Sequence, residues 1–195
     1  MKTISTASAF VLLALSLIGC GGGTLDGVSP GPMAMGDKHH LTLTRRWADV
    51  SPILPQRSKK VRVLSVDGPW LNRVYVARGL QPGEGMLKRQ DKEHPVPSFH
   101  ADMAPTELVE FATDSVSAMG YMRVETSKLR PARFGAADGL RFDLAAKTES
   151  GLEVQGTAQM AVAGKKLYVI LYLAPAEHYY AATLPDVEEM MRSAS

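Results

Sequence analysis

The feature that most constrains the fold is an apolar run near the C-terminus, residues 167–173, which reads Leu-Tyr-Val-Ile-Leu-Tyr-Leu. Successive side chains of a β-strand point to opposite sides of the sheet, so a strand that is apolar at every position needs cover on both sides. The run therefore predicts a central strand with a further layer of structure on each side of it.

Strand-like runs also precede it, at residues 121–129, 140–147 and 152–163. The last two alternate between apolar and polar residues, which is the pattern of a strand with one buried side. Turn-forming residues separate the runs, namely Gly135 and Asp138-Gly139, then Ser150-Gly151, then Gly164-Lys165. Short connections of this kind join neighbouring antiparallel strands, so this half of the chain is predicted to form an antiparallel meander.

Two helices are predicted beside these strands. The first spans residues 105–119, with its apolar residues on one face, Pro105 at its first position and Gly120 just after its end. After the central run we expect a short helical turn over residues 175–181. Pro185 then opens a last helix, because proline suits the first helical position.

The first half of the chain adds shorter strand-like runs, at residues 41–44, 61–66 and 71–77. Asp67-Gly68 between the last two is a turn signal, so these two runs are expected to pair as a hairpin. The doubly apolar central strand needs a helix on each face of the sheet. We therefore predict an α+β fold, an α/β/α sandwich whose mainly antiparallel sheet carries helices on both faces.

The N-terminus has the features of an export signal, with Lys2 in a short positive start and a mostly apolar stretch over residues 4–17. That stretch is too short for a transmembrane helix, which needs about 20 apolar residues. Leu17-Ile18-Gly19-Cys20 follows and resembles the lipobox of bacterial lipoproteins, and the chain contains no other cysteine. In that family the sulfur receives a diacylglyceryl group, the leader is cut before the cysteine, and the new amine is acylated. The alternative is an ordinary cleaved signal with a chance cysteine.

These features divide the chain into a lipoprotein signal peptide (1–19), a lipidated flexible tether (20–38) and a single globular domain (39–195). The tether assignment depends on a glycine- and proline-containing sequence without periodic apolar residues. Lipid on Cys20 is then predicted to attach the protein to a membrane. Gly21 stands where lipoproteins of the inner membrane usually carry Asp, so the resemblance implies the outer membrane, with the domain facing the periplasm.

The last part of the chain, residues 139–192, resembles the end of the PsbP-type sandwich. The shared pattern consists of a glycine turn between strands, the run at 166–172, Ala174-Pro175, an aromatic residue such as Tyr179 or Tyr180, and a closing helix. That superfamily includes extrinsic subunits of photosystem II, a Ran-binding nuclear-transport protein and many bacterial lipoproteins of unassigned role. The resemblance implies a PsbP-like fold and no particular activity, because the members share none.

Charge and motifs exclude several classes of function. Lys and Arg number 22 against 20 Asp and Glu, without a basic stripe, which is not the pattern of a nucleic-acid-binding protein. The sequence has no G-x-S-x-G elbow, no P-loop, no G-x-G-x-x-G after a strand and no H-E-x-x-H motif. We therefore expect no enzyme activity, no catalytic residues, no metal and no cofactor.

The candidates for contact with a partner or ligand are Trp70, Phe99, His100, Asp102, His178 and Tyr179. Trp70 follows a turn and is either an exposed contact residue or a core residue. His100 and Asp102 are two residues apart, so on a strand they would share a face as a His–carboxylate pair or half of a metal site. His178 with Tyr179 either lines a groove or caps a helix.

The leading hypothesis is a non-enzymatic, lipid-anchored envelope protein that binds a protein partner or supports an envelope assembly. The irregular stretch at residues 79–103 is the candidate contact element, because loops of this length are usually either functional or disordered. The alternative is a small-molecule or lipid carrier, which needs an apolar cavity between the sheet and a helix. An enzyme of unrecognised type would require His100, Asp102 and His178 to meet in one cleft.

Overall fold

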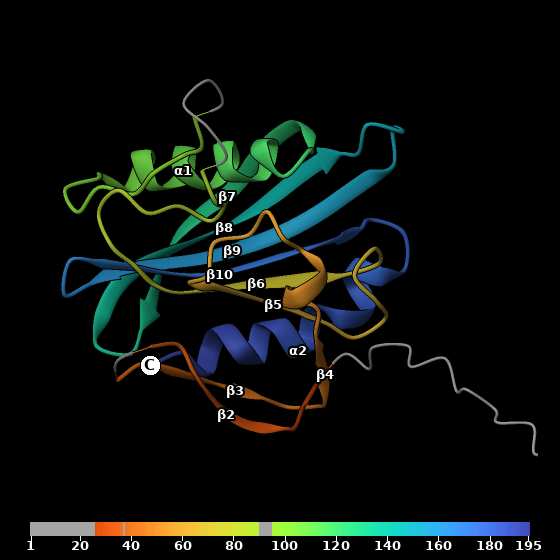
Figure 1. Cartoon of the computed structure of the whole chain (residues 1–195), viewed down its shortest axis with the longest axis horizontal. Coiled ribbons are helices and arrows are strands. Elements are labelled where there is room, and N and C mark those ends of the chain that lie inside the picture. Colours follow the sequence, from red (N-terminus) through yellow and green to blue (C-terminus); the bar gives the residue numbers. More distant parts are fainter. Residues whose placement is uncertain (1–25, 37, 90–94) are drawn as a thin grey trace, which may run out of the picture.

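The structure, a computed structural model, describes residues 26–36, 38–89 and 95–195 (Figure 1). Its helices are α1 (Pro105–Ala118), α2 (Tyr179–Ser193) and the short 3-10 helix η1 (Ser51–Ile53). Its strands are β1 (Gly27–Val28), β2 (Gly31–Ala34), β3 (His40–Leu43), β4 (Trp47–Asp49), β5 (Val61–Ser65), β6 (Arg73–Leu80), β7 (Met122–Phe134), β8 (Ala137–Lys147), β9 (Glu153–Ala163) and β10 (Lys166–Pro175).

The main sheet has 8 strands in the order β1-β4-β5-β6-β10-β9-β8-β7, and all of its neighbouring strands are antiparallel. The strands β7, β8, β9 and β10 follow one another in the chain and in space, which confirms the predicted meander. β10 lies between β6 and β9, so the run at 167–173 is a central strand, as predicted. The hairpin expected from residues 61–66 and 71–77 is the β5–β6 pair.

Buried apolar side chains form two clusters, and β10 contributes alternate residues to each. The first cluster takes Val169, Leu171 and Leu173 from β10 and packs them with Leu108, Phe111 and Val116 of α1. The second takes Tyr168, Ile170 and Tyr172 from β10 and packs them with Val187, Met190 and Met191 of α2. Figure 1 shows α1 beside β7, while α2 contacts β3 and β10. The fold is therefore a mainly antiparallel sheet with two helices.

The predicted helix at 105–119 is confirmed as α1, and local chemistry explains its start. Pro105 occupies the first turn, where its missing N–H leaves no hydrogen bond unmade. The Glu107 carboxylate accepts a hydrogen bond of 2.6 Å from the backbone N–H of Ala104. After the helix, Gly120 has a φ of +95°, a backbone conformation that favours glycine.

The predicted tether boundary at residue 38 is wrong for residues 26–36, which belong to the fold. β1 pairs with β4, and β2 pairs with β3. Met33 and Met35 are 5% and 0% exposed and lie in the second cluster. The glycines and prolines of this segment resemble a linker, but strand pairing with distant residues and two buried methionines outweigh that local tendency. Residues 1–25, including the predicted leader and Cys20, lie outside the described residues.

The C-terminal helix also differs from the prediction, because α2 begins at Tyr179 and contains Pro185 in its interior. Proline there cannot donate a backbone hydrogen bond to the preceding turn. The Tyr172 hydroxyl makes a separate contact in the first turn, where it donates to the carbonyl oxygens of Tyr179 and Tyr180 at 2.9 and 3.2 Å. A distant side chain therefore supports the first turn, and the two predicted segments form one helix.

The predicted contact loop at 79–103 is largely held against the core in its described part. Met86 and Phe99 are 2% and 0% exposed. The Phe99 N–H donates to the Glu84 carbonyl, and the Gly83 N–H donates to the Phe99 carbonyl, both at 2.8 Å. Met86 and Phe99 therefore have a structural role, while other described residues of the loop, such as Gln81 and Asp102, are exposed. The role of the loop as a contact element stays a prediction. Among the described residues, no helix is long and apolar enough to cross a membrane.

Candidate functional site

The connection between β5 and β6 is built around the buried side chain of Asn72, which is 1% exposed. Its Oδ1 accepts hydrogen bonds from the Ser65 hydroxyl and the Val66 N–H, each at 2.9 Å. Its Nδ2 donates to Asp67 Oδ2 at 2.6 Å and to Thr183 Oγ1 of α2 at 3.3 Å. The Asn72 amide thus links the two ends of the turn to each other and links the turn to α2. These bonds fix the residues between Asp67 and Asn72.

Trp70 projects from this fixed turn and is 74% exposed. Gly68 permits the turn because its φ is +110°, a value that side chains strongly disfavour. Since Asn72 fills the interior of the connection, Trp70 is left outside the core. The core alternative for Trp70 is therefore wrong, and its exposure is what the contact hypothesis requires.

Arg73 lies beneath Trp70 among aromatic rings. Its guanidinium carbon is 5.9 Å from the ring centroids of Trp70 and Tyr75, and 5.7 Å from that of Tyr121. One guanidinium nitrogen donates a hydrogen bond to the Tyr121 hydroxyl. Within the described part of the chain, Arg73 forms no ion pair with a carboxylate. Cation–π contacts hold the arginine in place and leave its charge available to a ligand.

Two hollows flank Trp70, and we call them together with the tryptophan the Trp70 surface. Their volumes are about 280 and 210 Å³, and Trp70, Arg73 and Met119 line both. Ile53 borders the larger hollow and Leu152 the smaller, and each is 47% exposed. Among the described residues that line the two hollows, none is acidic. The surface therefore combines exposed apolar groups with an arginine that lacks a carboxylate partner.

The two phenols beside Arg73 stay protonated at neutral pH. Burial raises the pKa of Tyr121 and of Tyr75, and the nearby Arg73 charge opposes this shift only in part. Their deprotonation is thus easier in the unfolded chain than in the folded one. Stability from these groups is fully present below pH 10 and is lost as the pH rises above it.

We accordingly expect the free energy of unfolding to fall as the pH is raised above about 10, the ordinary pKa of tyrosine. Tyr121→Phe removes one of the two buried phenols, so the free energy of unfolding of this variant should fall less steeply with pH. Urea unfolding of both proteins between pH 8 and 11 measures the two slopes. Equal slopes would contradict the assigned protonation of Tyr121.

The other predicted contact residues do not join the Trp70 surface. Phe99 is 0% exposed within the first cluster, so its assignment as a contact residue is wrong. Neither hollow beside Trp70 is lined by His100, Asp102 or His178, all of which are exposed. Among the described residues, no three or more His, Cys, Asp or Glu side chains form a group that could hold a metal ion.

His178 and Tyr179 stand at the start of α2. Their rings meet edge to face with centroids 5.2 Å apart, and His178 adopts a φ of +63° just before the helix. The Tyr179 carbonyl accepts the hydrogen bond from Tyr172. His178 thus occupies the cap position of α2, although its side chain makes no capping hydrogen bond.

Sequence reasoning missed Arg73, Asn72 and Tyr121 as parts of the surface. Asn72 carried a weak signal, because it closes the turn-rich segment Asp67-Gly68-Pro69-Trp70-Leu71-Asn72. Tyr121 carried none, since only the folded chain brings this residue, which precedes β7, to Arg73 of β6.

No protein-family model and no curated protein matches the sequence. The structure is similar to the solution structure of cyanobacterial PsbP (CyanoP) from Synechocystis sp. PCC 6803, with a TM-score of 0.50 and 13% identity over 91% of this chain and 95% of that chain. The Saccharomyces cerevisiae Ran-binding protein Mog1p gives a TM-score of 0.47 and 12% identity over 85% of this chain and 95% of that chain. A mutant of protein Mog1 gives 0.46 and 12% over 85% and 88%. The first similarity shows a PsbP-like fold, and fold alone does not specify function.

Proposed function

We propose that this protein is a non-enzymatic, lipid-anchored envelope protein that binds a protein partner through the Trp70 surface. The observation that carries the proposal is the 74% exposure of Trp70 on a turn fixed by Asn72. Tryptophan and arginine are enriched among the residues that dominate binding energy at protein interfaces. A rigid turn increases the affinity for a partner further, because an ordered side chain loses little conformational entropy on binding.

The size of the tryptophan makes the binding energy substantial. Burial of roughly 150 Å² of its apolar surface, at about 25 cal/mol per Å², contributes on the order of 4 kcal/mol before the costs of association. The hollows on both sides give a partner side chain a place to enter next to the indole ring. Exposed Ile53 and Leu152 extend the apolar area beyond it.

The partner's chemistry follows from charge complementarity. Arg73 carries a positive charge without a carboxylate partner in the described structure, and no acidic residue is found among the described residues lining the hollows. A partner segment that presents a carboxylate beside apolar side chains would satisfy Arg73 and fill the hollows together. We therefore assign the surface to an acidic, apolar segment of another envelope protein.

The anchor belongs to the same proposal. Support comes from the sequence, where the apolar leader ends in Leu17-Ile18-Gly19-Cys20. Lipid on Cys20 would hold the domain at the membrane, and the Gly21 that follows favours the outer membrane, with the domain in the periplasm. An anchored domain meets partners in two dimensions, where even a modest interface gains from a high effective concentration.

The three-layer α/β/α arrangement of the domain is likewise part of the proposal. Two separate apolar clusters support it, because each contains one helix and alternate residues of β10. In such an arrangement α1 and α2 each cover one face of the sheet. The end of the sheet that carries Trp70 is then left for a partner.

The test is capture of partners from crosslinked native membranes with the full-length protein. Wild type, Trp70→Ala and Leu129→Ala are compared, since Leu129 is also an exposed apolar residue, at 54%, and lies outside the Trp70 surface. We expect a protein that is recovered with wild type and Leu129→Ala and is about 30-fold depleted with Trp70→Ala, which corresponds to about 2 kcal/mol. Unchanged recovery with Trp70→Ala would contradict the proposal.

A second candidate function, carriage of an apolar ligand, is favoured by a different feature. An apolar groove of about 450 Å³ lies between the start of α1 and the strands β7, β8 and β9. Leu108, Leu140 and Val162 line it. The volume lies within the range of small-molecule sites, roughly 300–1,000 Å³. Mass spectrometry of the native protein should then detect a stoichiometric lipid that Val162→Trp, which fills the groove, removes.

A further inference from the structure

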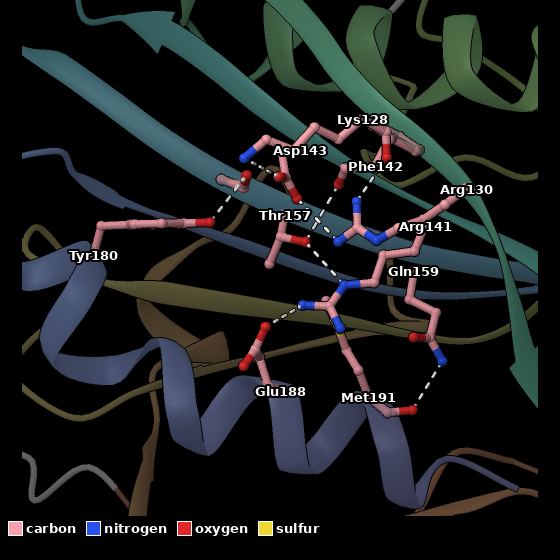
Figure 2. A network of polar contacts seen from close by, with 11 residues as sticks. Lys128, Arg130, Arg141, Phe142, Asp143, Thr157, Gln159, Tyr180, Glu188 and Met191 are labelled. Atoms are coloured by element: carbon pink, nitrogen blue, oxygen red, sulfur yellow. Dashed lines mark hydrogen bonds and ion pairs between the residues drawn. The ribbon is translucent and has the colours of Figure 1, made fainter.

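Two arginines oppose each other directly across the β7–β8 pair. Arg130 of β7 is the register partner of Arg141 of β8, and Arg141 is in turn the partner of Gln159 of β9. Figure 2 shows both guanidinium groups reaching over the same region of the sheet, near α2. Like charges directly opposite on neighbouring strands destabilise a sheet. The pairing therefore has a cost in stability, which the carboxylates of Asp143 and Glu188 offset in part.

Further arginines gather at the same place and form what we call the arginine groove. A hollow of about 400 Å³ is lined by Arg130, Arg133, Arg141 and Arg192. Of the described residues lining it, Glu188 alone carries a negative charge. Each arginine also has a carboxylate partner in the structure, namely Asp143 for Arg130, Asp138 for Arg133, Glu188 for Arg141 and Glu189 for Arg192. A ligand with several negative charges would compete with these carboxylates for the clustered guanidinium groups.

The existing partners of these arginines are exchangeable. Arg130 contacts Asp143 at 3.2 Å, and Asp143 is shared with Lys128 at 3.3 Å. Arg141 contacts Glu188 at 2.9 Å, and the Glu188 side chain is 44% exposed. Ion pairs with an exposed partner such as Glu188 contribute roughly 0–1 kcal/mol. The Asp143 side chain is less exposed, at 23%, and keeps Lys128 as a second partner when Arg130 is engaged elsewhere. A ligand with greater negative charge can therefore replace the carboxylates without a large loss of stability.

The scaffold of the groove is well fixed. The buried Gln159 amide donates to the carbonyl oxygen of Arg133 at 3.1 Å, which ties β9 to β7. It also donates to the carbonyl oxygen of Met191 at 2.8 Å, which ties β9 to α2 (Figure 2). Arg141 Nε donates to the Thr157 hydroxyl at 3.4 Å. Arginines on rigid strands and on a long helix present their donors with little loss of freedom on binding.

From this geometry we propose that the arginine groove binds a ligand with a phosphate group, a phosphomonoester or a diphosphate. The guanidinium fork matches phosphate oxygens bidentately, and two opposed arginines supply two such forks. The ligand neutralises the repulsion between Arg130 and Arg141, so its binding is stronger than that of an isolated arginine. The groove is distinct in its residues from the Trp70 surface, and the proposal does not depend on a protein partner.

The experiment is a calorimetric titration of the full-length protein in detergent with inorganic pyrophosphate, against sodium chloride of the same ionic strength. Arg130→Gln is the main variant, and Arg78→Gln is its control, because Arg78 is an exposed arginine of β6 outside the groove. We expect saturable binding by wild type and Arg78→Gln, and at least about tenfold weaker binding by Arg130→Gln. Absence of saturable binding, or equal weakening by Arg78→Gln, would overturn the proposal.

A second measurement excludes loss of folding as the cause. Arg130→Gln removes the opposed charge, so its unfolding midpoint in urea should equal or exceed that of wild type while its binding is reduced. A reduced midpoint that accounts for the lost binding would count against the site. Arg141→Gln should show the same binding defect, with its fold checked by circular dichroism.

Two sources of the phosphate group are separated by vesicle flotation. Vesicles of phosphatidylcholine with or without phosphatidic acid are mixed with a Cys20→Ala form, which lacks the proposed lipid. Flotation that requires phosphatidic acid and Arg130, and that pyrophosphate inhibits, identifies a lipid headgroup. Binding of pyrophosphate without such flotation identifies a soluble phosphate compound, and either result supports the site.

Discussion

Replacing Asn72 with alanine is expected to lower the free energy of unfolding by about 3 kcal/mol. The side chain is 1% exposed and forms hydrogen bonds with Ser65, Val66, Asp67 and Thr183. Alanine cannot form these hydrogen bonds, so the Ser65 hydroxyl and the Val66 N–H lose their acceptor. An unsatisfied buried group costs roughly 1–3 kcal/mol, and more than one such group is created here.

Urea unfolding of the full-length protein measures this effect, with Asp67→Ala as the matched control. The control removes one acceptor of the Asn72 amide and keeps the amide itself, so we expect a loss of only about 1 kcal/mol. Asn72→Ala should also weaken partner capture while the domain is still folded, at urea concentrations far below its unfolding midpoint. The reason is that the turn no longer holds Trp70 in place. Equal stability of the two variants would show that Asn72 does not organise the turn.

Replacing Cys20 with alanine is expected to release the protein from the membrane. Each buried CH₂ of an acyl chain contributes roughly 0.8 kcal/mol, and two or more chains anchor a protein stably. The chain has no other cysteine, so no second thiol can accept the diacylglyceryl group. Removal of the thiol should therefore abolish anchoring rather than weaken it.

Fractionation of cells that express the wild type and Cys20→Ala measures the distribution between membrane and soluble fractions. Mass spectrometry of the wild-type N-terminal peptide should find Cys20 as the first residue, with acyl chains on its sulfur and amine. Ser16→Ala, a change in the leader that keeps the thiol, is the control and should remain in the membrane. A wild-type N-terminal peptide without acyl chains on Cys20, or membrane retention of a Cys20→Ala protein whose leader has been cut, would contradict the anchor.

Several elements were predictable because local sequence and tertiary packing favour the same structure there. Residues 167–173 are apolar at every position, and only a central strand buries such a run completely. The α1 boundaries follow from Pro105 and Gly120, residues whose backbone chemistry suits the two ends of a helix. The turn residues between β7, β8, β9 and β10 likewise predicted hairpins, and hairpins are local structures.

Other elements were not predictable because their structure depends on distant residues. Residues 26–36 contain few apolar side chains, and they become part of the fold only through pairing with β3 and β4. Met33 and Met35 share a face of a strand by their spacing, which was the available signal. Pro185 predicted the start of a helix, whereas α2 begins at Tyr179, where the hydroxyl of Tyr172 contacts carbonyl oxygens of the first turn.

The candidate site also contains residues that the sequence identified and residues that it did not. Sequence singled out Trp70 but left its exposure open, because a tryptophan after a turn fits either a core or an interface. The outcome depends on Asn72, whose buried amide takes the interior position. The arginine groove had no sequence signal, since the opposition of Arg130 and Arg141 is a matter of strand register.

The most direct test of the central claim is photo-crosslinking of the full-length protein in its native membrane. A photoreactive phenylalanine analogue is placed at Leu152, on the Trp70 surface, or at Leu129, outside it. We expect a discrete protein adduct from position 152, none from position 129, and loss of the adduct when Trp70→Ala is added. An adduct at position 152 that persists with Trp70→Ala, or equal adducts from both positions, would contradict the claim.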